Sequence, residues 1–343
     1  MIQPLTFARS LSDGGRVRRP ATTRRAGGAA GRTRLGVAPD AQRLRVLWAT
    51  DDFDAARVAE GWMLRLRWSS PPLVDLLCVA TRRWRAAGLS VQTYRTAVQD
   101  AVGDLRQGEL MAAMRNANEV GQRLQGAGLR VQVWARHGSP PDEIAAVVRS
   151  EHPDLVVVSP SGRRRRLLPG PTVTQQVIRR AEVATLVARV PAVDEGELPR
   201  QILLAVTNER LAEHALGWLA RAGWLRAGRI TLVGVAARED STGNRDLPPD
   251  VRGAVGADLN VALERLAAIA AADAGPGGVD SRLLSGGTPA EHLLEACADG
   301  SSDLVVVPHP RPGQRYDFAE TIASTAPVSV LVMPPARAAA AAQ

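Results

Sequence analysis

An internal repeat constrains this chain more than any other feature of its sequence. The segments Gly138-Ser-Pro-Pro-Asp-Glu-Ile144 and Asp154-Leu-Val-Val-Val-Ser159 have counterparts 149 positions later, in Gly287-Thr-Pro-Ala-Glu-His-Leu293 and Asp303-Leu-Val-Val-Val-Pro308. The glycine precedes the aspartate by 16 positions in both copies. Matched residue types at equal spacing indicate two copies of one folded unit. Each copy therefore serves as a control for the other.

The length of 343 residues accommodates two domains of ordinary size. Composition shifts and proline-bounded polar stretches mark the boundaries between them. We predict an Arg-rich tail over 1–41, repeat one over 42–190, a linker over 191–199, repeat two over 200–334 and an Ala-rich tail over 335–343.

Short apolar runs alternate with segments of helical spacing in both repeats. The first and fourth predicted strands are Arg45–Thr50 and 155–158 in repeat one, and Ile202–Val206 and Leu304–Val307 in repeat two. The composition is 45% hydrophobic but only 3% aromatic, so the core must be aliphatic. This alternation predicts an α/β fold with two tandem doubly wound parallel-sheet domains. Ligands of such sheets bind at the carboxyl ends of the strands.

The positive net charge is concentrated in the N-terminal tail. The chain carries +8, of which residues 1–40 contribute +6 through eight Arg and two Asp. No Lys occurs, so all 43 basic residues are Arg. A basic tail can bind polyanions in a salt-dependent way. We favour a solvated extension over a nucleic-acid-binding segment, since runs of charge are usually solvated.

Several classes of site find no support in the sequence. No apolar run reaches the roughly 18 residues of a membrane span, and the N-terminus lacks the apolar stretch of a secretory signal, so we expect a cytoplasmic protein without a membrane partner. Cys78 and Cys297 lie in no Cys-x-x-Cys pair and are predicted to be buried and reduced. The five histidines, His137 among them, show no metal-binding spacing and are interpreted as surface or capping residues.

Residues that suit a nucleotide follow the first and fourth strands of repeat one. Asp51 can accept hydrogen bonds from ribose hydroxyls or an adenine amine. After the fourth strand, Ser159-Pro-Ser-Gly162 leads through Arg163–Arg166 to Gly170-Pro-Thr172, which opens a helix. Small residues let backbone N–H groups approach phosphates, and a helix start favours anions. The four arginines either clamp an anion or form a solvated loop.

These elements together resemble the universal stress protein family in its tandem form. In that family a strand like Asp-Leu-Ile-Val-Met leads into Gly-x-x-Gly and, after a spacer, into Gly-Ser or Gly-Thr, and this loop holds ATP phosphates in the nucleotide-binding members. The resemblance covers 42–334. It implies the adenine nucleotide alpha hydrolase-like fold, a non-catalytic role in stress response, and an intramolecular pseudo-dimer that pairs Ala184–Val190 with Val328–Met333. A further homodimer and an unknown protein partner stay open.

The family's nucleotide residues carry over only in part. Asp51, Gly162 and Thr172 match family positions, whereas Ser159 and Pro171 replace two glycines. The spacer over 163–170 is also one residue shorter than the family's. The resemblance therefore implies weak binding of ATP or AMP, with Mg²⁺ accompanying the nucleotide. The predicted binding residues are Asp51, Ser159, Gly162, Arg163, Gly170 and Thr172.

Repeat two departs further from the family pattern. Thr207 stands at the aspartate position, Pro308 and Arg311 replace the first two glycines, and the loop is four residues shorter. We predict that repeat two binds no nucleotide. Two alternatives stay open for the whole chain. One is a protein-interaction scaffold without nucleotide. The other is a nucleotide hydrolase of the same superfamily, which the absence of a positioned base, nucleophile or metal cluster disfavours.

Overall fold

The computed structural model describes residues 43–50, 53–80, 95–160, 171–180, 182–191, 196–235, 249–284, 288–298, 302–309 and 318–334. Repeat one contains β1 (Arg45–Thr50), α1 (Phe53–Arg65), β2 (Leu73–Ala80), α2 (Arg95–Gly126), β3 (Arg130–His137), α3 (Pro140–Glu151), β4 (Leu155–Val158), α4 (Val173–Arg180) and β5 (Ala184–Val187). Repeat two contains β6 (Gln201–Val206), α5 (Glu209–Ala222), the 3-10 turn η2 (Trp224–Arg226), β7 (Arg229–Val235), α6 (Pro249–Asp273), β8 (Val279–Leu284), α7 (Pro289–Ala298), β9 (Leu304–Pro308), α8 (Phe318–Thr325) and β10 (Ser329–Met333).

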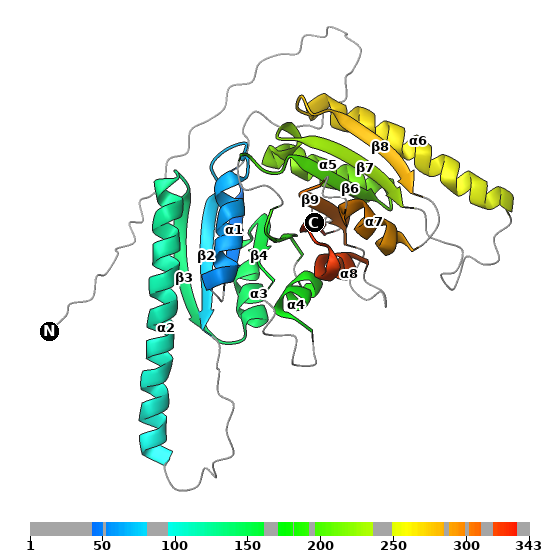
Figure 1. Ribbon diagram of the computed structural model, residues 1–343. Coiled ribbons are helices and arrows are strands. Elements are labelled where there is room, and N and C mark those ends of the chain that lie inside the picture. The colour runs from blue at the N-terminus through cyan, green and yellow to red at the C-terminus, as the bar shows by residue number, and fades with distance from the viewer. Residues whose placement is uncertain are drawn as a thin grey trace, which may run out of the picture. The chain divides into compact units, whose positions relative to one another are not determined.

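The ten described strands form one sheet that runs through both repeats, in the order β3-β2-β1-β4-β5-β10-β9-β6-β7-β8 (Figure 1). Neighbouring strands within each repeat are parallel. The strand order reverses beside β1 and again beside β6, which defines a doubly wound sheet. The predicted α/β class is therefore confirmed. β5 and β10 pair antiparallel, with Leu186 opposite Leu331, and this pairing of the last strands joins the two repeats.

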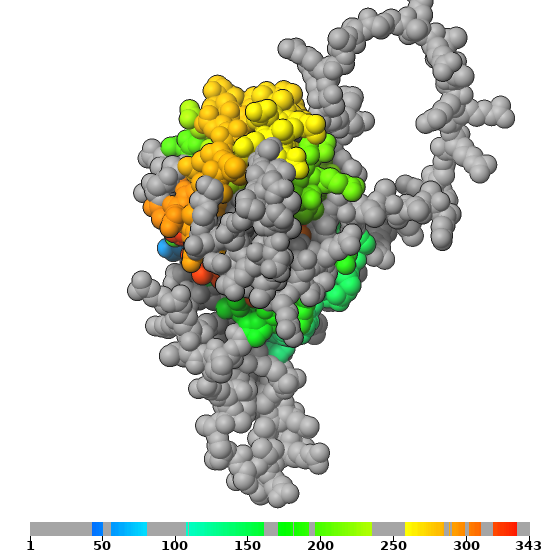
Figure 2. Space-filling model, turned by 90° about the vertical axis from the view of Figure 1, so that its right-hand side faces the viewer, coloured from blue at the N-terminus to red at the C-terminus, as the bar shows by residue number. Residues whose placement is uncertain are grey.

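Helices cover both faces of the sheet. Successive strand residues point to opposite faces, so Val46 and Trp48 belong to one buried cluster while Leu47 and Ala49 belong to the other. The first cluster takes side chains from α1, α2, α5 and α6, and the second from α3, α4, α7 and α8. Both clusters contain residues of both repeats, so each core continues across the β5–β10 junction. The side of repeat two formed by α6 and β8 faces the viewer in Figure 2, in yellow and orange.

Two helices begin earlier than the apolar spacing predicts. The spacing indicates helices over 104–126 and 259–272, whereas α2 starts at Arg95 and α6 at Pro249. Apolar spacing marks the part of a helix that packs on the sheet. Backbone hydrogen bonding extends a nucleated helix beyond that part, because each added residue gains one bond.

The segment that follows α1 packs against repeat two. Ser69 N donates to Ala222 O at 3.0 Å at the end of α5. The indole of Trp68 lies 5.7 Å from that of Trp224, which is 5.1 Å from Trp218. Trp218 and Trp224 are buried. The contact between the repeats thus extends beyond the paired strands.

Candidate functional site

The carboxyl ends of β1 and β4 lie side by side in repeat one, because the two strands are parallel neighbours with Ala49 opposite Val158. Both predicted nucleotide segments leave the sheet at this edge. Four of the predicted binding residues lie outside the described part of the chain, namely Asp51, Gly162, Arg163 and Gly170. Ser159 and Thr172 are described.

Ser159 follows β4 directly, and its hydroxyl oxygen is buried without a hydrogen-bond partner among the described residues. Leaving a buried hydroxyl without a partner costs about 1–3 kcal/mol. A buried polar atom of this kind calls for an explanation, such as a ligand, an ion or water. Ser159, which replaces the family's first loop glycine, therefore places at the edge of the sheet a hydroxyl donor that has no partner among the described residues.

His137 is a second such residue, which the spacing argument does not single out. It ends β3 at the same carboxyl edge, where Gly138 N donates to Ala80 O at 3.1 Å. Its Nε2 atom is buried without a partner among the described residues. The interpretation of His137 as a surface or capping residue is therefore wrong for this nitrogen. The alternation of residues predicts a strand over 129–134, whereas β3 runs on to His137, so the sequence pattern did not mark this residue.

Thr172 precedes α4 and forms a capping box with Gln175. Its backbone N–H donates to Gln175 Oε1 at 2.8 Å, and its Oγ1 accepts from Gln175 N at 3.2 Å. This reciprocal arrangement satisfies two backbone donors that a helix start leaves unpaired. The Thr172 N–H is thus occupied, while its hydroxyl is exposed and keeps its own hydrogen for donation.

The matching edge of repeat two is built differently. Thr207 follows β6 and is exposed, and the next residue, Asn208, caps α5 by accepting from Leu211 N at 3.3 Å. Pro308 stands in the place of Ser159 and is a buried residue of β9, opposite Met333. Proline has neither a hydroxyl nor a backbone N–H. Arg311 lies outside the described residues.

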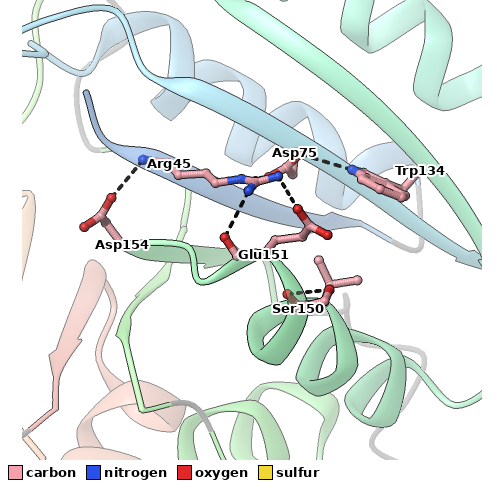
Figure 3. Close-up of polar contacts among 7 residues, drawn as sticks. Arg45, Asp75, Trp134, Ser150, Glu151 and Asp154 are labelled. Carbon is pink, nitrogen blue, oxygen red and sulfur yellow. Dashed lines mark hydrogen bonds and ion pairs between the residues drawn. The ribbon is translucent and has the colours of Figure 1, made fainter. Parts of the chain in front are cut away.

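Arg45 organises the opposite, amino-terminal edge of repeat one (Figure 3). Its Nε donates to Asp75 Oδ2 at 2.6 Å, its Nη2 donates to Glu151 Oε2 at 2.5 Å, and its backbone N–H donates to Asp154 Oδ2 at 3.0 Å. Asp75 is fully buried and also accepts from Trp134 Nε1 at 3.1 Å. The hydrogen bond to the Asp75 carboxylate raises the pKa of the Arg45 guanidinium. The carboxylates of Asp75 and Glu151 therefore compensate the positive charge of the Arg45 guanidinium.

The aspartate of the repeated motif has the same role in both copies. Asp154 accepts from Arg45 N, and Asp303 accepts from Gln201 N at 2.7 Å and from Arg200 N at 2.9 Å. Each aspartate therefore ties the start of the first strand of its repeat to the start of the fourth. The repeated Asp-Leu-Val-Val-Val run is explained by the fold and needs no ligand.

A hollow of about 320 Å³ lies at the edge of repeat two that corresponds to the Arg45 network. Gln201 occupies the position of Arg45, since each is the first residue of its strand and pairs with the first residue of the next. Arg229 contacts Asp280 there at 3.3 Å. The hollow is lined by Gln201, Arg229, Thr231, Asp280, Ser281 and Arg282. It lies at the amino-terminal ends of the strands of repeat two, whereas the candidate nucleotide segments follow the carboxyl ends of β1 and β4 in repeat one.

The family described as the universal stress protein family matches residues 43–189 and 199–334 of this chain. The chain belongs to the universal stress protein family. The two matches show a tandem member, with one family unit in each repeat. No curated protein matches this universal stress protein.

Solved structures share the fold. A universal stress protein from Archaeoglobus fulgidus DSM 4304 aligns at a TM-score of 0.59 with 17% identity, over 86% of this chain and 99% of that one. A putative universal stress protein from Pseudomonas aeruginosa UCBPP-PA14 aligns at a TM-score of 0.50 with 13% identity, over 86% of this chain and 94% of that one. At these identities the likeness establishes the fold of this universal stress protein and nothing more.

The described ranges contain neither a cluster of metal ligands nor a membrane-spanning helix. No group of three or more His, Cys, Asp or Glu residues in these ranges is arranged to hold a metal ion. No helix in them is long and apolar enough to cross a membrane.

Proposed function

We propose that this protein is a non-catalytic stress-response protein that binds an adenine nucleotide, ATP or AMP, weakly in repeat one. The observation that carries the proposal is the Ser159 hydroxyl, which is buried and has no hydrogen-bond partner among the described residues where the family loop leaves β4. A phosphate oxygen is a strong acceptor for such a hydroxyl. The family membership of both repeats supports a nucleotide as the source of that phosphate.

Each predicted residue has a distinct role in this proposal. Ser159 and Thr172 donate hydroxyl hydrogen bonds to phosphate oxygens, and Gly162 and Gly170 let backbone N–H groups approach them. Arg163 adds a guanidinium, and Asp51 accepts from the ribose or adenine. Mg²⁺ would be held mainly by the phosphates of ATP, which is how this ion is usually bound.

Repeat two acts as the structural partner of the nucleotide-binding repeat. Thr207 stands at the position of Asp51, and Pro308 lies in β9 without a donor. These two replacements remove the carboxylate and the hydroxyl that repeat one offers at the same edge. We therefore propose one nucleotide per chain.

Titration calorimetry of the full chain with ATP and Mg²⁺, and separately with AMP, tests this proposal. At about 100 µM protein we expect binding at one site. Ser159→Ala weakens binding about tenfold, because it removes a hydrogen bond to a charged group, and Asp51→Ala weakens it as well. The matched control is Thr207→Ala, at the position of Asp51 in repeat two, which leaves binding unchanged. Absence of heat with both nucleotides would falsify the proposal.

A scaffold without nucleotide is the second candidate, favoured by one specific contact. The capping box uses the Thr172 N–H, which is thereby lost to a phosphate, and Pro171 offers none. The same titration separates the candidates, since a scaffold gives no heat with any variant. Steady nucleotide turnover that disappears in Asp51→Ala would instead identify a hydrolase.

A further inference from the structure

The two repeats meet about a local pseudo-two-fold axis. Leu186 of β5 lies opposite Leu331 of β10, its counterpart 145 positions later. The helices α4 and α8, each of eight residues, are offset by the same 145 positions. A contact from repeat one to repeat two therefore has a symmetry-related counterpart with the roles of the repeats exchanged. Two identical units would make every such contact twice.

The contact between α4 and α8 differs on the two sides of this axis. On one side Arg179 donates twice to Glu320, from Nε to Oε2 at 2.8 Å and from Nη2 to Oε1 at 2.9 Å. The counterpart positions are Gln175 and Ser324, where Gln175 Nε2 donates to Ser324 Oγ at 3.4 Å. The Glu320 side chain is only 10% exposed. The Arg179 guanidinium therefore compensates a largely buried carboxylate.

Arg189, which follows β5, makes a second set of contacts that differs between the two sides of the pseudo-two-fold axis. Its backbone N–H donates to Ser329 Oγ at 2.8 Å, and its Nη2 donates to Ala323 O at 2.6 Å in the last turn of α8. A cation is favourable at a helix C-terminus, where carbonyl groups are unpaired. Burial lowers the pKa of this guanidinium. Pro334, the counterpart of Arg189, has no backbone N–H, and Ala184, the counterpart of Ser329, has no hydroxyl.

Pairing of identical repeats from two chains would lose these contacts. Two copies of repeat one would set Arg179 against Gln175 and leave the Arg189 N–H without its hydroxyl acceptor. Two copies of repeat two would set Glu320 against Ser324, so a carboxylate that is only 10% exposed would lose the Arg179 guanidinium, which is unfavourable. Pairing of repeat one with repeat two satisfies every one of these groups.

We propose that Arg179, Glu320, Arg189 and Ser329 form a pairing code that directs repeat one onto repeat two and disfavours the pairing of two identical repeats. The code acts because each pairing of identical repeats loses the Arg179–Glu320 ion pair and the Arg189–Ser329 hydrogen bond. The partner that this surface fits is therefore repeat two, which the same chain supplies at high effective concentration. The code is independent of nucleotide binding, since none of the four residues belongs to the proposed nucleotide site.

Charge reversal in the full chain tests the pairing code. Arg179→Glu places two carboxylates together, and we expect the unfolding midpoint to fall by about 3–6 °C. After unfolding and refolding at high protein concentration, this variant forms more chain dimers and larger species than the unmodified protein in sedimentation velocity. Arg179→Glu combined with Glu320→Arg restores both the midpoint and the mass distribution. The matched control is Arg180→Glu, the neighbouring residue of α4, whose guanidinium contacts Asp142 within repeat one.

A second variant tests the code without breaking the natural ion pair. Gln175→Glu with Ser324→Arg supplies an ion pair on both sides of the axis, so pairing of identical repeats becomes satisfied as well. The Thr172 capping box persists, because a glutamate accepts from a backbone N–H as Glu291 does from Thr288 N at 3.0 Å. We expect more interchain species on refolding with no loss of thermal stability. A mass distribution identical to the unmodified protein in both this variant and Arg179→Glu overturns the proposal, as does a stability loss in Arg179→Glu without any change in association.

Discussion

Ion pairs between arginine and aspartate contribute differently to the stability of this protein because the side chains differ in burial. Asp75 is fully buried and holds both Arg45 and Trp134. Asp280 contacts Arg229 at 3.3 Å with a side chain that is 59% exposed. Water compensates an exposed charge that loses its partner, whereas a buried charge has no such substitute.

Asp75→Ala is therefore expected to lower the free energy of unfolding by about 3 kcal/mol, since it leaves the guanidinium of Arg45 partly uncompensated. Asp280→Ala, the control at an exposed pair, changes it by less than about 1 kcal/mol. Urea denaturation followed by circular dichroism measures both values. Equal effects of the two substitutions would mean that the Arg45 network adds nothing beyond a surface pair.

At the scale of elements, the junction between α5 and η2 depends on one glycine. The sequence predicts a helix over 210–225, but α5 ends at Ala222 because Gly223 adopts a left-handed conformation with φ of 90°. A Cβ atom at this position would lie 2.8 Å from the backbone nitrogen of Ser69, in the segment between α1 and β2. Gly223 thus ends α5, and its lack of a side chain also allows the backbone of Ser69 in repeat one to approach closely.

Gly223→Ala is expected to lower the free energy of unfolding by about 2–4 kcal/mol, from backbone strain and from the clash with Ser69. Gly128→Ala is the matched control, since Gly128 also has a positive φ, of 86°, but no atom within 4 Å of the added Cβ. Its cost is about 1 kcal/mol. Similar midpoints for the two variants in thermal denaturation would show that the close approach of Ser69 costs little.

At the scale of the whole molecule, the two family units behave as one body. Each of the two buried clusters draws side chains from both repeats, and the sheet continues through the β5–β10 pair. Trp68 of repeat one also packs on Trp224 of repeat two. Separating the repeats would therefore expose aliphatic core on both faces of the sheet.

We expect differential scanning calorimetry to show a single unfolding transition for the full chain, because shared cores make the unfolding of one repeat unfavourable without the other. Asp75→Ala, which alters only repeat one, moves that transition as a whole to lower temperature. Two separated transitions, with only one of them shifted by the substitution, would show that the repeats unfold independently.

The sequence by itself determined the duplication, the α/β class and the family, because these depend on local periodicity and on motif spacing. The resemblance to the family then implied the pairing of the last strands. The sequence also pointed to Ser159 and Thr172, but not to how each is used. Tertiary structure alone decided that the Ser159 hydroxyl has no partner among the described residues, that Thr172 closes a capping box, and that Arg45 and Arg179 find carboxylates 30 and 141 positions away. The physical reason is that such partners are set by packing between distant segments, which no local spacing records.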